Sequence, residues 1–268
     1  MILLVLGLIV LLAVQADFVT TVLSGGRQGP LTEHLTSAFW RLEQKLHRWR
    51  GGGFFHAHSG VLVMVAVALA WLLLTSLGWL LIYRSDSTSL VVSETGKPAD
   101  WVQSFAYVGS ALSTMGAANT SASNGWWDLI ATVAAANGFV LLTLAMTYVL
   151  NVTQTVASGR SFALLVSSLD PTDPRHTDTF ATGLSRLVAQ LSSTPLALYF
   201  SSRDPNLRLA RAIGRFSQRV SASPELWPCF AASLKALPGI KLDGMAQSDE
   251  AEVERWVEHY SLNRNELD

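Results

Sequence analysis

Three long apolar stretches dominate the first half of the chain. The first runs from Met1 to about Leu23, the second covers Ser59–Tyr83 without a charge, and the third runs from about Trp127 to Ala157. A stretch of about 20 apolar residues predicts a helix that spans the membrane. The chain becomes more polar after the third stretch. The pattern therefore predicts an all-α membrane protein with a polar C-terminal region.

The first stretch has two interpretations. Val14-Gln15-Ala16 offers the small residues of a signal-peptide cleavage site after an uninterrupted apolar core. However, no Lys or Arg precedes that core, whereas a secretory signal begins with a positively charged segment. A retained N-terminal transmembrane helix is therefore favoured, and removal of residues 1–16 is the alternative.

The polar regions have the spacing of amphipathic helices. In the C-terminal region, a linker at Asp170–Pro174 is rich in helix breakers. Apolar positions recur at helical spacing in Phe180–Leu191, Leu207–Val220 and Glu250–Tyr260, which predicts a small helical domain. Four domains follow: an N-terminal helix at 1–24, a linker at 25–58, a membrane domain at 59–157 and a helical domain at 158–268.

The linker contains a further amphipathic segment, Leu31–Trp49. Such a helix either lies along the inner membrane surface or packs on protein, and its pattern fits both positions. Its apolar face consists of Leu35, Phe39, Leu42 and Leu46.

Composition and charge exclude several classes of protein. Half of the residues are hydrophobic and 15% are charged, against about 25% charged in soluble domains. A formal net charge of −1 offers no basic field for nucleic acid. The single cysteine, Cys229, excludes an intrachain disulfide, and we identify neither a metal site nor an enzymatic motif. We therefore expect no catalytic residues and no cofactor.

The distribution of basic residues predicts the orientation. Five Lys and Arg residues lie in Gly25–Phe54, whereas Arg84–Gln103 contains two that acidic residues offset. The positive-inside rule places Gly25–Phe54 in the cytoplasm. The N-terminus is then outside, and the C-terminal region is cytoplasmic.

A short apolar segment, Trp101–Met115, lies between the second and third stretches and is followed by small and polar residues at Gly116–Gly125. It is too short to span a membrane. A short helix followed by irregular backbone between two spans predicts a re-entrant loop or an extracellular turn.

This loop resembles the pore of the potassium-channel family. The family pattern is a pore helix ending in Thr-Thr-x-Gly-Tyr-Gly-Asp between two spanning helices, and this chain has Ser-Thr-Met-Gly-Ala-Ala-Asn at 113–119. More narrowly, the chain is similar to bacterial two-transmembrane channel proteins with a helical C-terminal domain, in which a stretch resembling Thr194–Asp204 follows the pore. The resemblance implies a homotetramer in a bacterial inner membrane. It also implies a selectivity filter formed by Thr114, Met115, Gly116, Ala117, Ala118 and Asn119.

The departures from the family pattern predict altered selectivity. Carbonyl groups that point at one axis need alternating backbone hands, and glycine adopts φ > 0 without a steric cost. Gly116 keeps one such position, but Ala118 replaces the second glycine. Ala117 replaces the tyrosine beside the filter, and Asn119 replaces the acidic residue. We therefore expect K⁺ or Na⁺ to pass with weak selectivity, if the loop conducts.

A polar stripe follows the third apolar stretch. Asn137, Thr147, Asn151 and Thr155 fall within about 80° on a helix at about 100° per residue. The stripe either lines an aqueous pore or forms hydrogen bonds between helices. Gly138 occupies the place of the family's hinge glycine and also fits a close-packing face.

Two functions from different classes follow from the sequence. The first is a tetrameric, weakly selective cation channel in the bilayer, with a regulatory ligand or protein acting on the cytoplasmic domain. The second is a channel-like scaffold that no longer conducts and serves assembly or signalling.

Overall fold

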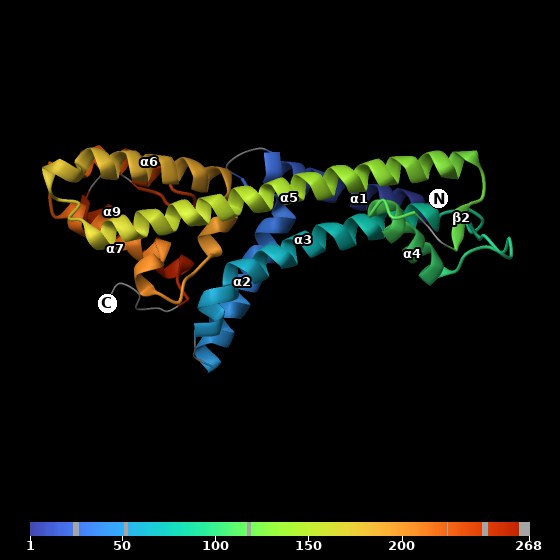
Figure 1. Ribbon diagram of the computed structural model, residues 1–268, viewed down its shortest axis with the longest axis horizontal. Helices are drawn as coiled ribbons and strands as arrows, with labels where there is room; N and C mark the ends of the chain where they lie inside the picture. Colours follow the sequence, from blue (N-terminus) through green and yellow to red (C-terminus); the bar gives the residue numbers. More distant parts are fainter. Residues whose placement is uncertain (24–26, 51–52, 117–118, 224, 243–245, 263–268) are drawn as a thin grey trace. The chain divides into compact units, whose positions relative to one another are not determined.

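The computed structural model describes most of the chain and is mostly helical in that part (Figure 1). Two compact units are present, and two of the three boundaries between them fall in the interior of long helices. The first unit comprises Met1–Val22 and Val67–Tyr148, and the second comprises Leu23–Ala66 and Val149–Asp268. The predicted linker therefore belongs to the same unit as the C-terminal helices. The described residues are 1–23, 27–50, 53–116, 119–223, 225–242 and 246–262.

Three helices in the described residues are long and apolar enough to cross a membrane: α1 (Ile2–Leu23), α3 (Gly53–Tyr83) and α5 (Gly125–Ser168). These helices confirm the prediction that each of the three apolar stretches forms a helix of spanning length. With 44 residues, α5 is about 66 Å long at about 1.5 Å per residue, whereas the hydrocarbon core is about 30 Å thick. The helix therefore continues well beyond the end predicted at Ala157.

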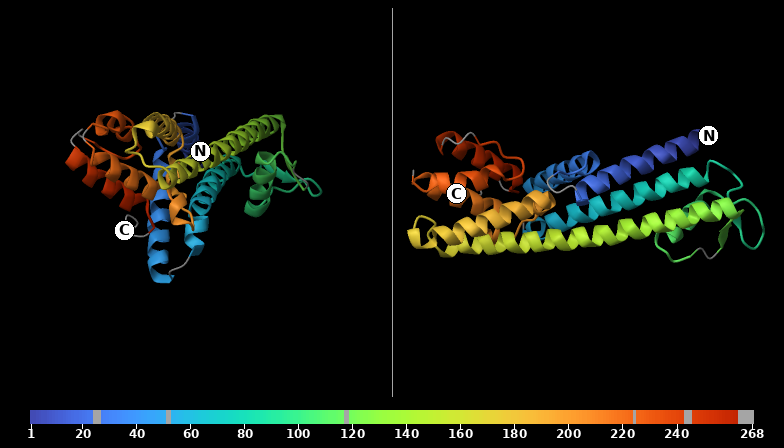
Figure 2. Two further views of the ribbon diagram at one scale, coloured as in Figure 1. Left: turned by 60° about the vertical axis from the view of Figure 1, so that its left-hand side comes forward. Right: turned by 90° about the horizontal axis from the view of Figure 1, so that it is seen from above.

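Close packing of small residues joins α1 to α3, and the two run side by side in the first unit (Figure 2). A Cβ atom at Gly7 would lie 2.7 Å from the carbonyl oxygen of Gly78. Small residues allow helix backbones in membranes to approach in this way. Beside this contact, the indole N–H of Trp71 donates to the Asp17 carboxylate over 3.0 Å. A buried carboxylate in a membrane span thus has an indole donor as a partner.

A short helix and a two-stranded antiparallel sheet fill the segment between α3 and α5. The short helix α4 (Trp101–Leu112) begins with a capping box in which Asp100 and Gln103 satisfy each other's backbone N–H groups. Strands β1 (Leu90–Val92) and β2 (Thr120–Ala122) pair in antiparallel register around it. Three-residue strands carry too little alternation to be predicted, whereas the short helix at Trp101–Met115 is confirmed.

The second unit contains α2 (Pro30–Arg50), α6 (Thr177–Ser193), α7 (Leu209–Ser221), α8 (Trp227–Lys235) and α9 (Ala246–Tyr260), with 3-10 turns η1 (Pro174–His176), η2 (Pro195–Tyr199) and η3 (Pro205–Leu207). Its aromatic core consists of four phenylalanines, one each from α5, α6, α7 and α8. They are Phe162, Phe180, Phe216 and Phe230, and the centroids of neighbouring rings lie 5.0–6.4 Å apart. Helices α2, α6, α7 and α9 confirm the predicted amphipathic segments. The helix α8 was not predicted.

The helix α2 packs on protein with a face other than its apolar one. Thr36, Trp40 and Glu43 are buried, and the indole N–H of Trp40 donates to the His259 carbonyl oxygen over 2.8 Å. The predicted apolar face remains largely open, because Phe39, Leu42 and Leu46 are exposed. Protein packing and an exposed apolar surface are thus combined in one helix.

Candidate functional site

The backbone after α4 alternates in hand. Thr114 has φ +59° and Gly116 has φ +78°, both in the left-handed region. A β-branched residue in this region is rare because its side chain crowds the backbone. A Cβ atom at Gly116 would have no neighbour within 4 Å, so glycine is needed there for its conformation and not for space. The sequence identified Gly116, but gave no signal for Thr114.

The remaining predicted filter residues differ in their placement. Met115 is 84% exposed. The Asn119 carbonyl accepts a hydrogen bond from the Ser93 N–H over 3.0 Å, which fixes the strand that leaves the loop. Ala117 and Ala118 lie outside the described residues.

The C-terminal end of α4 packs against Gly138 of α5. A Cβ atom there would overlap the backbone of Leu112, including its carbonyl oxygen. Gly138 therefore acts in the close-packing role, and the backbone contact is a sufficient physical reason for glycine at this position. The expectation of a hinge gains no support from this geometry.

The polar stripe on α5 is divided, and two of its members form hydrogen bonds with other segments. The Asn137 amide oxygen accepts from Trp79 Nε1 over 3.1 Å and from Gln15 Nε2 over 3.3 Å. Asn137 thus joins α5 to α3 and α1, which is the interhelical alternative. Thr155 is buried and its hydroxyl lies 2.7 Å from that of Thr194. The sequence spacing could not separate these residues because both lie at the same angle as a pore-facing position.

The other two members remain on the surface. Thr147 and Asn151 are exposed, as are the neighbouring Thr143 and Gln154. The Thr143 and Thr147 hydroxyls donate to carbonyls one turn earlier in α5, at 2.8 and 3.0 Å. The Asn151 and Gln154 amides form no side-chain hydrogen bond with the described residues. They constitute an exposed polar face on a helix that is apolar enough to span a membrane.

A third feature, the segment Thr194–Phe200, connects the spanning helices with the C-terminal helices. We call it the coupling segment. The Ser59 hydroxyl of α3 donates to the Tyr199 carbonyl over 3.1 Å, and a Cβ atom at Gly60 would overlap the ring of Phe200. On its other side, Tyr199 contacts the ring of Trp40 in α2 at 5.4 Å. The resemblance identified this stretch, but not its contacts.

Comparisons with known proteins define the broad class only. No family model matches the chain, and no solved structure matches it. The uncharacterized membrane protein YdjJ of Bacillus subtilis (strain 168) is 31% identical over 166 residues. The matched region covers 61% of this chain and 48% of that protein, so the chain spans about half the length of this relative. Together with three apolar helices, this similarity identifies a membrane protein with several apolar helices, which lies in a lipid bilayer.

Proposed function

We propose that the protein is a homotetrameric channel for monovalent cations, with Thr114–Asn119 as a non-standard and weakly selective filter. The observation that carries this proposal is the alternating backbone at Thr114 and Gly116, placed directly after a short helix between two apolar spans. Alternating hands turn successive carbonyl groups toward one side of a loop. Rings of such carbonyls replace the hydration shell of a cation in ion-channel filters.

The charges around the loop suit a cation. The C-terminal end of α4 carries the negative end of the helix dipole, and it ends directly before Thr114. No Lys or Arg occurs between Lys97 and Arg160 in the sequence. A permeating cation would therefore meet carbonyl groups and helix dipoles without a fixed positive charge.

The exposed polar face of α5 supports assembly around an axis. A single chain supplies one loop, and a closed ring of copies is needed to surround an ion. Amides such as Asn151 and Gln154 are costly against lipid. Facing a water-filled axis would hydrate them, whereas the apolar surfaces of α1 and α3 would face lipid.

The alternative is a channel-like scaffold that does not conduct. One observation favours it: the Asn137 amide forms hydrogen bonds between helices. The replacement of the second filter glycine by Ala118 points the same way. Under this alternative, the exposed face of α5 serves contact with another protein.

Cation flux into liposomes tests the proposal. K⁺, Na⁺ and choline are compared for the purified protein and two matched variants, Gly116→Ala and Gly109→Ala. Both positions have open space around an added Cβ atom, but only Gly116 has a positive φ. An alanine in the left-handed region costs about 1–2 kcal/mol, so Gly116→Ala should distort the loop and reduce flux, whereas Gly109→Ala should leave it unchanged.

Native mass spectrometry of the same preparation should give four chains per particle. Equal flux in the two variants would contradict the assignment of residues 114–119 as the filter. A folded tetramer without flux above that of empty liposomes would favour the scaffold.

A further inference from the structure

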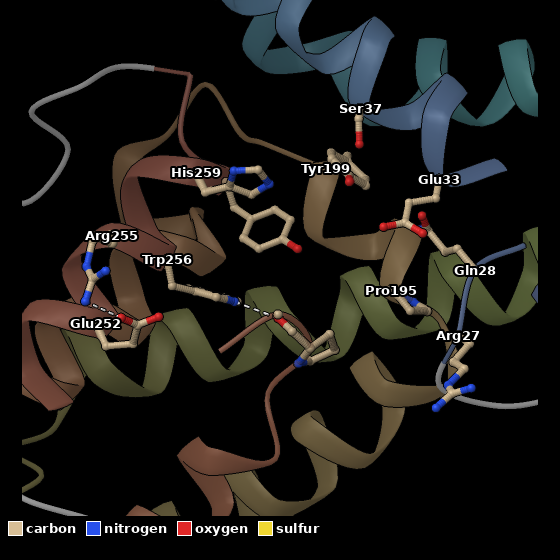
Figure 3. A pocket seen from close by; sticks show the side chains of 13 residues that line it. Arg27, Gln28, Glu33, Ser37, Pro195, Tyr199, Glu252, Arg255, Trp256 and His259 are labelled. Atoms are coloured by element: carbon tan, nitrogen blue, oxygen red, sulfur yellow. Dashed lines mark hydrogen bonds and ion pairs between the residues drawn. The ribbon is translucent and has the colours of Figure 1, made fainter. Parts of the chain in front are cut away.

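The second unit contains a cavity that no part of the pore proposal uses. Its volume is about 670 Å³, within the range of about 300–1,000 Å³ typical of small-molecule sites. One side consists of the segment before α2 and the first turns of α2, and α9 forms the other side (Figure 3). The turn η2 and residues 238–239 complete the wall.

Aromatic rings form an apolar surface in this cavity. Tyr260 contacts Tyr199 at 5.7 Å and Trp256 at 5.0 Å between ring centroids. The indole N–H of Trp256 donates to the Pro238 carbonyl over 2.8 Å, which fixes that ring. Burial raises the pKa of both tyrosines, so their hydroxyl groups stay protonated at neutral pH. The cavity wall is therefore partly aromatic, with Tyr260 half-buried and with Tyr199 and Trp256 only 6% and 4% exposed.

Four charged side chains line the cavity: two form a salt bridge with each other, and two form none with the described residues. On the α9 side, Arg255 forms a salt bridge with Glu252. On the opposite side, Figure 3 shows Arg27 and Glu33 together with Gln28. Arg27 and Glu33 form no ion pair with the described residues. One wall thus presents a free cation and a free anion to the same cavity.

We propose that this cavity binds a free α-amino acid with a large aromatic or apolar side chain. The ammonium group would pair with Glu33, and the carboxylate would pair with the Arg27 guanidinium, which binds carboxylates in a forked geometry. The side chain would lie against this aromatic wall, chiefly at Tyr260, because Tyr199 and Trp256 are almost fully buried. A ligand with a single charge would leave either Arg27 or Glu33 without a partner.

Occupancy of the cavity would reach the spanning helices through the coupling segment. Pro195 and Tyr199 line the cavity and belong to this segment. Thr194 contacts α5, and the Tyr199 carbonyl accepts from Ser59 of α3. This regulatory consequence rests on the proposed channel function, whereas the binding itself does not depend on conduction.

Calorimetric titration of the full chain in detergent micelles tests the binding. L-tryptophan is the probe, and two analogues each lack one charge: tryptamine has no carboxylate and indole-3-propionate has no amine. We expect L-tryptophan to bind at least about ten-fold more tightly than either analogue, since a hydrogen bond to a charged group contributes about 1.5–3 kcal/mol. Because this comparison uses the unaltered protein, it does not depend on the folding of a variant.

Variants assign the two charges. Glu33→Gln and Arg27→Gln should each weaken L-tryptophan binding about ten-fold or more. Glu258→Gln on α9 and Arg186→Gln on α6 change exposed residues outside the cavity and should bind as the unaltered protein does. Absence of binding at millimolar L-tryptophan, or equal binding of either analogue, overturns the assignment. Binding without any effect on flux would retain the site and contradict only the regulatory consequence.

Discussion

Glu43 shows how burial of a single carboxyl group makes stability depend on pH. Glu43 is only 4% exposed, and neither of its carboxylate oxygens forms a hydrogen bond with the part of the chain that the structure describes. Loss of hydration raises its pKa from 4.5 to about 7. The folded protein therefore holds this proton more tightly than the unfolded chain does. As the pH rises from 4.5 to about 7, ionisation of the Glu43 carboxyl lowers the stability of the folded state.

Glu43→Gln should stabilise the protein, and more so at pH 8 than at pH 5. At pH 8 the carboxylate is ionised in both states and the folded state bears the cost, whereas near pH 5 the folded carboxyl is largely neutral. The expected difference between the two pH values is about 1–2 kcal/mol, after allowance for screening by solvent. Thermal unfolding at both pH values measures it.

Glu254→Gln on α9 is the matched control for this change, because Glu254 is exposed. It should shift the melting temperature equally at both pH values. A gain from Glu43→Gln that does not depend on pH would show that the Glu43 carboxyl is hydrated.

At the scale of elements, α5 carries polar residues in two different environments along one helix. Asn137 accepts two side-chain hydrogen bonds from neighbouring helices, whereas Asn151 is exposed. The same residue type thus has two environments, which makes the two positions a natural pair for mutation.

Asn137→Leu and Asn151→Leu should affect different properties of the protein. Loss of its two interhelical bonds should make Asn137→Leu less stable by about 1–2 kcal/mol, measured by thermal unfolding in detergent. Asn151→Leu should unfold as the unaltered protein does and reduce cation flux, because it removes an amide from the polar face. Reduced stability in Asn151→Leu with unchanged flux would contradict the proposed pore-facing role.

The helix α2 carries three surfaces: a protein face with Trp40, an apolar face with Leu46, and a basic flank with Arg41 and Lys45. Both its ends lie within a few residues of membrane-spanning helices. An apolar face beside basic residues is typical of a helix at the membrane surface. We infer that α2 packs against α9 and η2 within the second unit and also binds the lipid interface.

Nitroxide labels should reveal this position in liposomes. In a Cys229→Ser background, a label at Leu46→Cys should be more accessible to oxygen, which concentrates in lipid. A label at Arg41→Cys should be more accessible to a water-soluble relaxation agent. Equal accessibility of the two labels to both agents would place the apolar face against another protein.

At the scale of the whole molecule, the distribution of charge predicts on which side of the membrane each segment lies. The C-terminal region, with Cys229 in α8, is expected in the cytoplasm. Since Cys229 is the sole cysteine of the chain and is exposed, it reports on this orientation without any substitution.

An impermeant maleimide should leave Cys229 unlabelled in intact bacterial spheroplasts and label it after permeabilisation. A Lys97→Cys, Cys229→Ser variant provides the matched control, because Lys97 lies in the segment predicted to be outside and is exposed. It should react before permeabilisation. Labelling of Cys229 in intact spheroplasts would invert the predicted topology.

The sequence alone determined the features that depend on local chemistry. Apolar length predicted the three spans, helical spacing predicted four of the helices in the second unit, and the position of Gly116 predicted a left-handed residue. Each of these follows from a residue and its neighbours in the chain, since hydropathy, periodicity and backbone conformation act over short distances.

Only the tertiary structure decided which partner each residue meets. Asn137 and Thr155 share one angle with a pore-facing stripe, yet their hydrogen bonds come from segments far away in the sequence. Gly138 fitted both a hinge and a close-packing face in the sequence, and the backbone of Leu112 lies against it. The cavity likewise joins residues more than 150 positions apart. Periodicity gives the direction of a side chain, but only the packing of distant segments decides whether that direction leads to water, lipid or protein.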